Sequence, residues 1–102
     1  MIIIAGTTPT IEYTFDSVTV ANITTAVFTI KQNGQPVIEK TLADATVGEK
    51  KISFTLSQAE TLALSRTKVT KLYLDYVLND GTRGAGITRN ATIAAAGKQE
   101  VI

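Results

Sequence analysis

Several short stretches of the chain alternate strictly between apolar and polar residues. In residues 10–16, for example, Ile11, Tyr13 and Phe15 share one face while polar residues occupy the other. Successive side chains of a strand point to opposite faces, so this period of two is typical of a strand buried on one side. The chain is therefore predicted to be mostly β. The other stretches expected to form strands are residues 24–32, 51–56, 68–78 and 83–93.

Turn signals separate these strands at intervals of roughly 8–12 residues, a spacing typical of β-sandwiches. Asn33-Gly34 and Asn79-Asp80-Gly81 are the clearest of them. We predict six or seven short strands in an antiparallel β-sandwich. The length of 102 residues and the hydrophobic content of 44% suit one core, so residues 1–102 are expected to form a single domain.

One short helix is predicted after the strand at residues 51–56. Ser57 and Glu60 have the spacing of a capping box, and apolar residues follow directly. The helix is expected over about residues 58–65, as a crossover between the two sheets.

The register of the hairpin at Asn33-Gly34 follows from side-chain parity. A two-residue loop would pair Phe28 with Glu39 on the core face and bury a charge. A three-residue loop, with Gly34 in the left-handed position of a bulge, brings Ile38 onto the face of Phe28. We predict the bulged hairpin, with positive φ at Gly34.

The composition argues against catalysis. The chain contains neither histidine nor cysteine, so the most common general base and the thiolate zinc ligand are both missing. The acidic residues expected on solvent faces or in turns show no spacing that would enforce a close pair. We predict no catalytic, cofactor-binding or metal-binding residues, and a protein that is not an enzyme. These acidic residues are Glu12, Glu39, Asp75 and Asp80.

The segment from Gly81 to Gly86 has closely spaced glycines, as phosphate-binding loops do. Its context favours a flexible hairpin tip, because a phosphate loop joins a strand to a helix, whereas this segment lies between two strands.

The charge distribution argues against nucleic acid as a partner. Ten basic residues against nine acidic ones give a net charge of +1, and the charges are scattered along the chain.

Two groups of residues are candidates for an interaction surface. Ile2, Ile3 and Ile4 form a continuous apolar run, which needs cover on both faces. The run is expected to promote self-association or docking, unless the helix or the closing Val101-Ile102 covers it within one monomer.

The second candidate group lies on the outward face of the strand at residues 68–78. Tyr73 and Val77 are expected there, with Val27 on a neighbouring strand, as a modest apolar patch. The patch either binds a partner or is covered by the helix. Arg83, at the start of the returning strand, is included in this candidate surface.

The apolar N-terminal stretch is five residues long, far short of the ~20 that span a bilayer. It also lacks the basic start of a signal peptide. We therefore expect no membrane association. The protein is expected to act in the cytoplasm or in a particle that is assembled there.

Several segments of the chain together resemble a known family. These segments are residues 28–34, 38–46, 56–61, 80–81 and 101–102. They look like the small immunoglobulin-like proteins of bacteriophages and prophages of Gram-positive bacteria, whose relatives include the N-terminal module of the phage baseplate upper protein. The resemblance covers most of the chain. Unlike the baseplate module, the chain is expected to stand alone, with no downstream stalk or receptor-binding domain.

The resemblance implies an immunoglobulin-like sandwich and a non-catalytic structural role in a virion or its tail, with other virion components or further copies as partners. The protein is then expected in the virion, or in the host bacterial cytoplasm during assembly. It carries over no catalytic or ligand-binding residues. The alternative is a free-standing immunoglobulin-like module that recognises a protein or carbohydrate through its loops. The predicted loops at residues 31–36 and 79–86 contain no aromatic residue, which carbohydrate binders usually expose.

Overall fold

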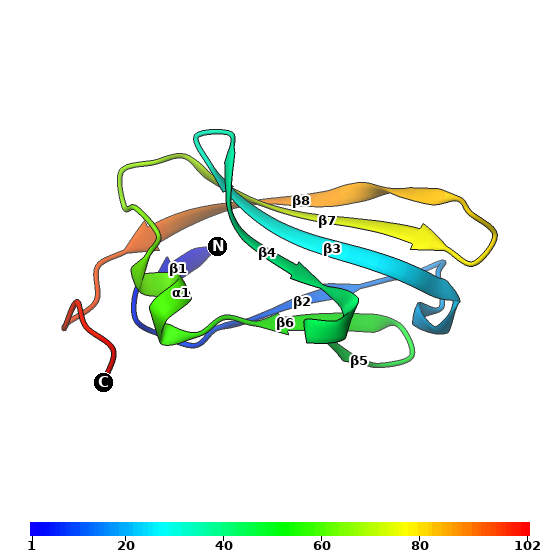
Figure 1. Ribbon diagram of the computed structural model, residues 1–102, viewed down its shortest axis with the longest axis horizontal. Coiled ribbons are helices and arrows are strands. Elements are labelled where there is room, and N and C mark those ends of the chain that lie inside the picture. Colours follow the sequence, from blue (N-terminus) through cyan, green and yellow to red (C-terminus); the bar gives the residue numbers. More distant parts are fainter.

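The computed structural model consists of two β-sheets packed face to face (Figure 1). It describes the backbone of residues 1–102 and the side chains of all of them except residues 85–87. The helical elements are α1 (Gln58–Leu62) and the 3₁₀ turns η1 (Val20–Asn22) and η2 (Leu42–Asp44). The strands are β1 (Ile2–Ile4), β2 (Thr10–Thr14), β3 (Ile23–Gln32), β4 (Gln35–Thr41), β5 (Thr46–Val47), β6 (Lys51–Thr55), β7 (Thr70–Leu78) and β8 (Arg83–Ala94).

The strand order confirms the predicted sandwich. One sheet has five strands in the order β1-β8-β7-β3-β4, and the other has three in the order β2-β6-β5. Strands β8-β7-β3-β4 correspond to G-F-C-C′ of an immunoglobulin domain, and β2-β6-β5 correspond to B-E-D. In Figure 1 the five-stranded sheet forms the upper layer, and α1 lies at one end of the sandwich.

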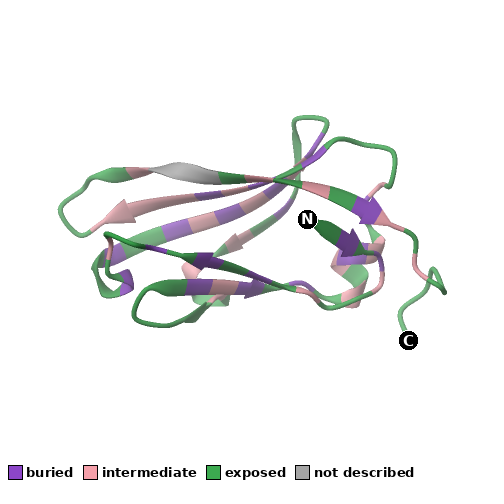
Figure 2. Cartoon of the chain, turned by 180° about the vertical axis from the view of Figure 1, so that it is seen from behind, coloured by how far each residue is buried: buried purple, intermediate pink, exposed green. Residues whose placement is uncertain are grey.

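The core lies between the sheets and is built from the alternating residues (Figure 2). Phe28 stacks on Phe54 at 4.8 Å between ring centroids, and the edge of Tyr13 meets Phe28 at 6.1 Å. Leu72 and Leu74 close the same layer from β7 and are fully buried. Burial of each such side chain contributes roughly 1.5–3 kcal/mol, so the alternation determines which face of each strand turns inward.

The β3–β4 hairpin confirms part of the prediction and corrects the rest. Gly34 has a φ of +79°, as predicted, and Ile38 is buried opposite Ile30. The loop has two residues, however, since Asn33 also has positive φ, which makes a type I′ turn. The extra residue lies in β4, where the register shifts between its pairings with Ile30 and Lys31. A bulge in the strand changes parity as a longer loop would.

The N-terminal run and the strand count correct the prediction. Strand β1 pairs parallel to β8, so the five-stranded sheet is not purely antiparallel. The strands number eight instead of six or seven, and two of them, β1 and β5, have only three and two residues. The run also alternates in burial: Ile3 is 1% exposed and lies in the core, while Ile2 is 72% and Ile4 48% exposed. Ile3 is therefore a core residue and not part of an interaction surface.

Helix α1 connects the two sheets as predicted, and ends at Leu62, three residues earlier than expected. Its capping box is formed: Ser57 Oγ accepts from the N–H of Glu60, and the Glu60 carboxylate accepts from the N–H of Ser57. In the described part of the chain, no helix has the length and apolar character needed to cross a membrane.

Candidate functional site

The five-stranded sheet has one face in the core and one face turned away from it, which we call the outer face. Strands β3 and β7 lie side by side along the middle of this sheet. Helix α1 does not lie over this face (Figure 1). The cross-strand pairs that point outward are Thr25 with Val77, Val27 with Asp75, Thr29 with Tyr73, and Lys31 with Lys71.

The structure brings most of the predicted surface residues together. Tyr73 and Val77 lie on the outer face, and Arg83 lies opposite Val77 on β8. Ile2 and Ile4 belong to the same face, because Ile3 between them points into the core. The two candidate groups therefore form parts of one surface.

The proposed covers protect the exposed isoleucines only in part. The closing residue Ile102 is held on α1, where Gln58 Nε2 donates to its carbonyl at 3.1 Å and Gln58 Oε1 accepts from its N–H at 2.8 Å. Ile4 shares a shallow hollow with Ile102 and Ala96, while Ile2 is largely exposed. The outer face thus remains open at its β1 edge.

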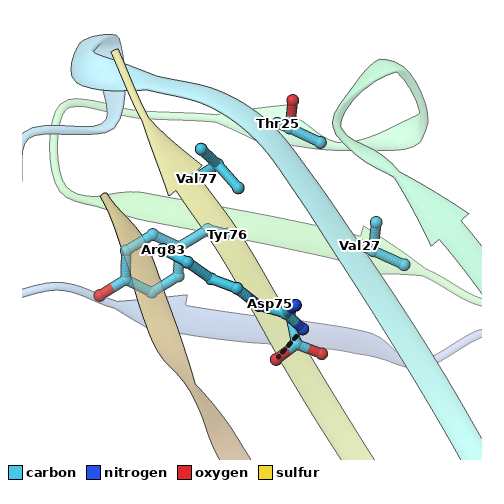
Figure 3. A pocket seen from close by; sticks show the side chains of 6 residues that line it. All are labelled: Thr25, Val27, Asp75, Tyr76, Val77 and Arg83. Atoms are coloured by element: carbon cyan, nitrogen blue, oxygen red, sulfur yellow. Dashed lines mark ion pairs between the residues drawn. The ribbon is translucent and has the colours of Figure 1, made fainter. Parts of the chain in front are cut away.

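One end of the outer face carries a shallow hollow (Figure 3). Thr25 and Val27 of β3 line it on one side, and Asp75 and Val77 of β7 line it on the other. Arg83 reaches across from β8, with its guanidinium Nη2 at 3.7 Å from Asp75 Oδ1. Both groups of this ion pair are exposed, so it contributes little to stability and leaves both charges accessible.

The other end of the outer face is basic. Lys31 and Lys71 lie directly opposite each other on β3 and β7, and both line a second hollow with Tyr73 and Val69. The Lys31 ammonium lies over the Tyr73 ring at 5.2 Å from its centroid. Like charges placed directly opposite each other destabilise a sheet, so this end favours a negatively charged neighbour.

The segment from Gly81 to Gly86 begins with a turn, as predicted. Gly81 has a φ of +87°, and the N–H of Thr82 donates to the Asp80 carboxylate at 2.9 Å, which lowers the pKa of Asp80. Gly84 has a packing role, since a Cβ there would lie 2.0 Å from the Tyr76 ring. The side chains of residues 85–87 lie outside the described part.

Two other carboxylates, those of Glu12 and Glu60, form ion pairs within the domain. Glu12 pairs with Lys51 at 3.5 Å, and Glu60 pairs with Lys40 at 3.1 Å. Partial burial raises the pKa of Glu60, but hydrogen bonds from Ser57 and the charge of Lys40 outweigh it, so the pKa lies below its ordinary value. Among the described residues, no three acidic side chains gather into a group that could hold a metal ion.

Tyr13 is a titratable group in the core. Its ring is fully buried, and its hydroxyl has no hydrogen-bond partner among the described residues. Burial raises the pKa of Tyr13 to about 12, although the positive charge of Arg89 acts in the opposite direction. The Arg89 guanidinium lies 4.4 Å from the centroid of the Tyr13 ring and donates to the carbonyl of Glu12, which links β8 to β2.

Tyr13→Phe is expected to stabilise the domain by about 1 kcal/mol near pH 7, because it removes a buried hydroxyl without a partner. The advantage should grow with pH. Unfolded Tyr13 loses its proton near 10.0, whereas folded Tyr13 keeps it to about 12, so the parent loses stability as pH rises between these values. Urea unfolding of both proteins at pH 8, 10 and 12 measures the difference. A constant difference would contradict the assignment.

Comparison with models of known protein families, with curated proteins and with solved structures finds no match to this chain. Alternation within residues 68–78 places Lys71 and Asp75 on the same outward face as Tyr73 and Val77 but does not single them out. The register of β3 against β7, which places Lys31 opposite Lys71, is what joins the scattered charges into one surface.

Proposed function

We propose that this chain is a non-catalytic structural component of a phage or prophage particle, associated with its tail or baseplate. It acts by protein–protein contact through the outer face. The observation that carries the proposal is the open outer face, where apolar residues and accessible charges run along the full length of β7. The resemblance of the sequence to small immunoglobulin-like phage proteins supplies the kind of assembly.

The composition of the outer face suits a protein partner. Val27, Tyr73 and Val77 offer apolar contact, and the threonines beside them offer hydroxyl groups at the same level of the sheet. Protein interfaces are enriched in aromatic residues and in arginine, which Tyr73 and Arg83 supply here. The charged groups at both ends give such a contact orientation and specificity.

A carbohydrate-binding module has less support. Tyr13 is buried in the core, and the Tyr76 ring packs against Phe15 at 5.3 Å. Tyr73 remains on the outer face, but the Lys31 ammonium already lies over its ring. A sugar would have to displace this ammonium before it could stack on Tyr73.

Particles purified by density gradient from the strain that encodes the protein test the proposal. Quantitative mass spectrometry is expected to find the chain at a constant copy number per particle. Val77→Glu, which places a charge in the apolar part of the outer face, should reduce incorporation about tenfold. Lys51→Glu, on the opposite sheet, should leave incorporation unchanged. Absence of the chain from particles, or equal incorporation of both variants, contradicts the proposal.

A further inference from the structure

The outward residues of β7 and the residue before it form a self-complementary pattern, because reversing their order exchanges lysine with aspartate and keeps the valines and the tyrosine in place. In order they are valine, lysine, tyrosine, aspartate and valine, at positions 69, 71, 73, 75 and 77. Val69 extends the strand: its carbonyl accepts from the N–H of Asn33 at 2.8 Å, and its N–H donates to Asn33 Oδ1 at 2.9 Å. It is 66% exposed, Lys71 is also exposed, and the other three outward residues are half-buried.

We propose that the outer face binds a second copy of this chain. The two-fold axis lies in the plane of the interface, crosses β7 at Tyr73 and runs perpendicular to the strand. This inference deepens the proposed function by naming the first partner of the outer face. Across the axis, Tyr73 meets the partner's Tyr73, Lys71 faces the partner's Asp75, and Val69 faces the partner's Val77.

The charges select this orientation. An axis parallel to the strands would place Lys71 against the partner's Lys71 and Asp75 against the partner's Asp75, and such contacts between like charges are unfavourable. The perpendicular axis gives two Lys71–Asp75 pairs, one on each side of Tyr73. A self-complementary patch of this kind is what a closed two-fold dimer requires.

The strands beside β7 fit the same arrangement, except that Glu39 meets the partner's Glu39. Lys31 lies beside Lys71 and adds a second positive charge at the level of the partner's Asp75, while Thr29 meets its own equivalent. Glu39, opposite Thr29 on the edge strand β4, also meets its own equivalent. Packed sheets are rotated by about 30°. The rotation separates the two β4 strands, and Glu39 is exposed to screening solvent.

The outer face has enough area for a modest dimer. Nine residues of a strand span about 26–30 Å, and five strands span roughly 24 Å. Burial of this face would remove on the order of 600 Å² per copy, near the lower limit for specific protein interfaces. We therefore expect a dimer that dissociates on dilution.

Charge reversal tests the pairing directly. Lys71→Asp and Asp75→Lys each replace two attractive pairs by two repulsive ones in the symmetric dimer. Each variant alone should have a dimer dissociation constant at least about tenfold above that of the parent. An equimolar mixture should recover a dimer within about threefold of the parent, because one copy of each restores both pairs. Light scattering measures the dissociation constants, and native mass spectrometry identifies the mixed dimer.

The controls separate this inference from folding and from the proposed function. Lys71 is exposed and the Asp75 side chain is partly exposed, so circular dichroism melts of both variants should match the parent within a few degrees. Lys51→Asp on the opposite sheet should leave the dimer unchanged. A parent that stays monomeric at a protein concentration of about 1 mM overturns the inference, because a dissociation constant above this value is too weak to matter. So does a dimer that either reversal leaves intact, or a mixture without mixed dimer. Incorporation of the parent into particles is measured separately and is unaffected by these outcomes.

Discussion

Gly84→Ala is expected to lower the free energy of unfolding by about 2–3 kcal/mol. Gly84 lies opposite Tyr76 in the β7–β8 pair, and the tyrosine ring lies across its Cα. A Cβ at this position would be 2.0 Å from Tyr76 Cζ, so the ring must swing away. It then loses its edge-to-face contact with Phe15, at 5.3 Å between centroids.

Thermal and urea unfolding measure this effect, with Gly97→Ala as the matched control. A Cβ at Gly97 meets nothing within 4 Å, so the control should stay within about 0.5 kcal/mol of the parent. In a Tyr76→Ala background the ring is absent, and Gly84→Ala should then cost little. Equal effects of Gly84→Ala in both backgrounds would show that the ring is not the cause.

Thr61→Val is expected to destabilise the domain by about 2–3 kcal/mol although it keeps the shape of the side chain. Thr61 is fully buried in α1 and connects the helix to the turn after β1. Its Oγ1 accepts from the N–H of Gly6 at 2.9 Å and donates to the carbonyl of Thr7 at 2.8 Å. Valine leaves both backbone groups without this partner.

The control for Thr61→Val is Thr55→Val, at an exposed position where the hydroxyl contacts Thr10 Oγ1 at 3.0 Å. The control should change the free energy of unfolding by less than about 0.5 kcal/mol. Amide hydrogen exchange at Gly6 adds a local readout and should become faster in Thr61→Val. Equal stability of the two variants, with unchanged exchange at Gly6, would contradict the role assigned to Thr61.

Patterns within short stretches of the sequence predicted the features that depend on neighbouring residues alone, namely the buried strand faces and the start of the helix. Alternation placed Tyr13, Phe28 and Leu72 in the core correctly, because every second residue of a strand with one buried face is apolar. The capping box gave the start of α1 correctly, since both of its hydrogen bonds lie within four residues.

The hairpin at Asn33 shows which feature side-chain parity predicts and which it does not. Parity required one extra residue between Phe28 and Ile38, and the structure contains it. Parity does not say whether the residue belongs to the loop or to the strand, because both give the same faces. The positive φ of Asn33 allowed a two-residue loop, and the extra residue then fell in β4.

Long-range contacts account for the features that were missed. The parallel pairing of β1 with β8 joins the two ends of the chain, and it turns Ile3 inward and Ile2 outward. Gln32 is buried although glutamine is usually exposed, because Ser65 and Thr70 satisfy its side chain. No local pattern identifies partners more than thirty residues away.

The outer face was predicted in part for the same reason. Tyr73 and Val77 were expected on one face from the alternation of β7 alone. The grouping of Lys31 with Lys71, and of Ile2 with the same surface, depends on strand order and register. These are properties of the assembled sheet.

Competitive acylation of lysines tests most directly the claim that the outer face is the contact surface. Lys31 and Lys71 lie on this face, whereas Lys51 lies on β6 of the other sheet. Labelling is measured by mass spectrometry in dilute protein and in protein concentrated enough to associate. The account predicts that Lys31 and Lys71 react more slowly in the concentrated protein while Lys51 keeps its rate. Protection of Lys51 with unchanged Lys31 and Lys71, or equal rates for all three at every concentration, would contradict it.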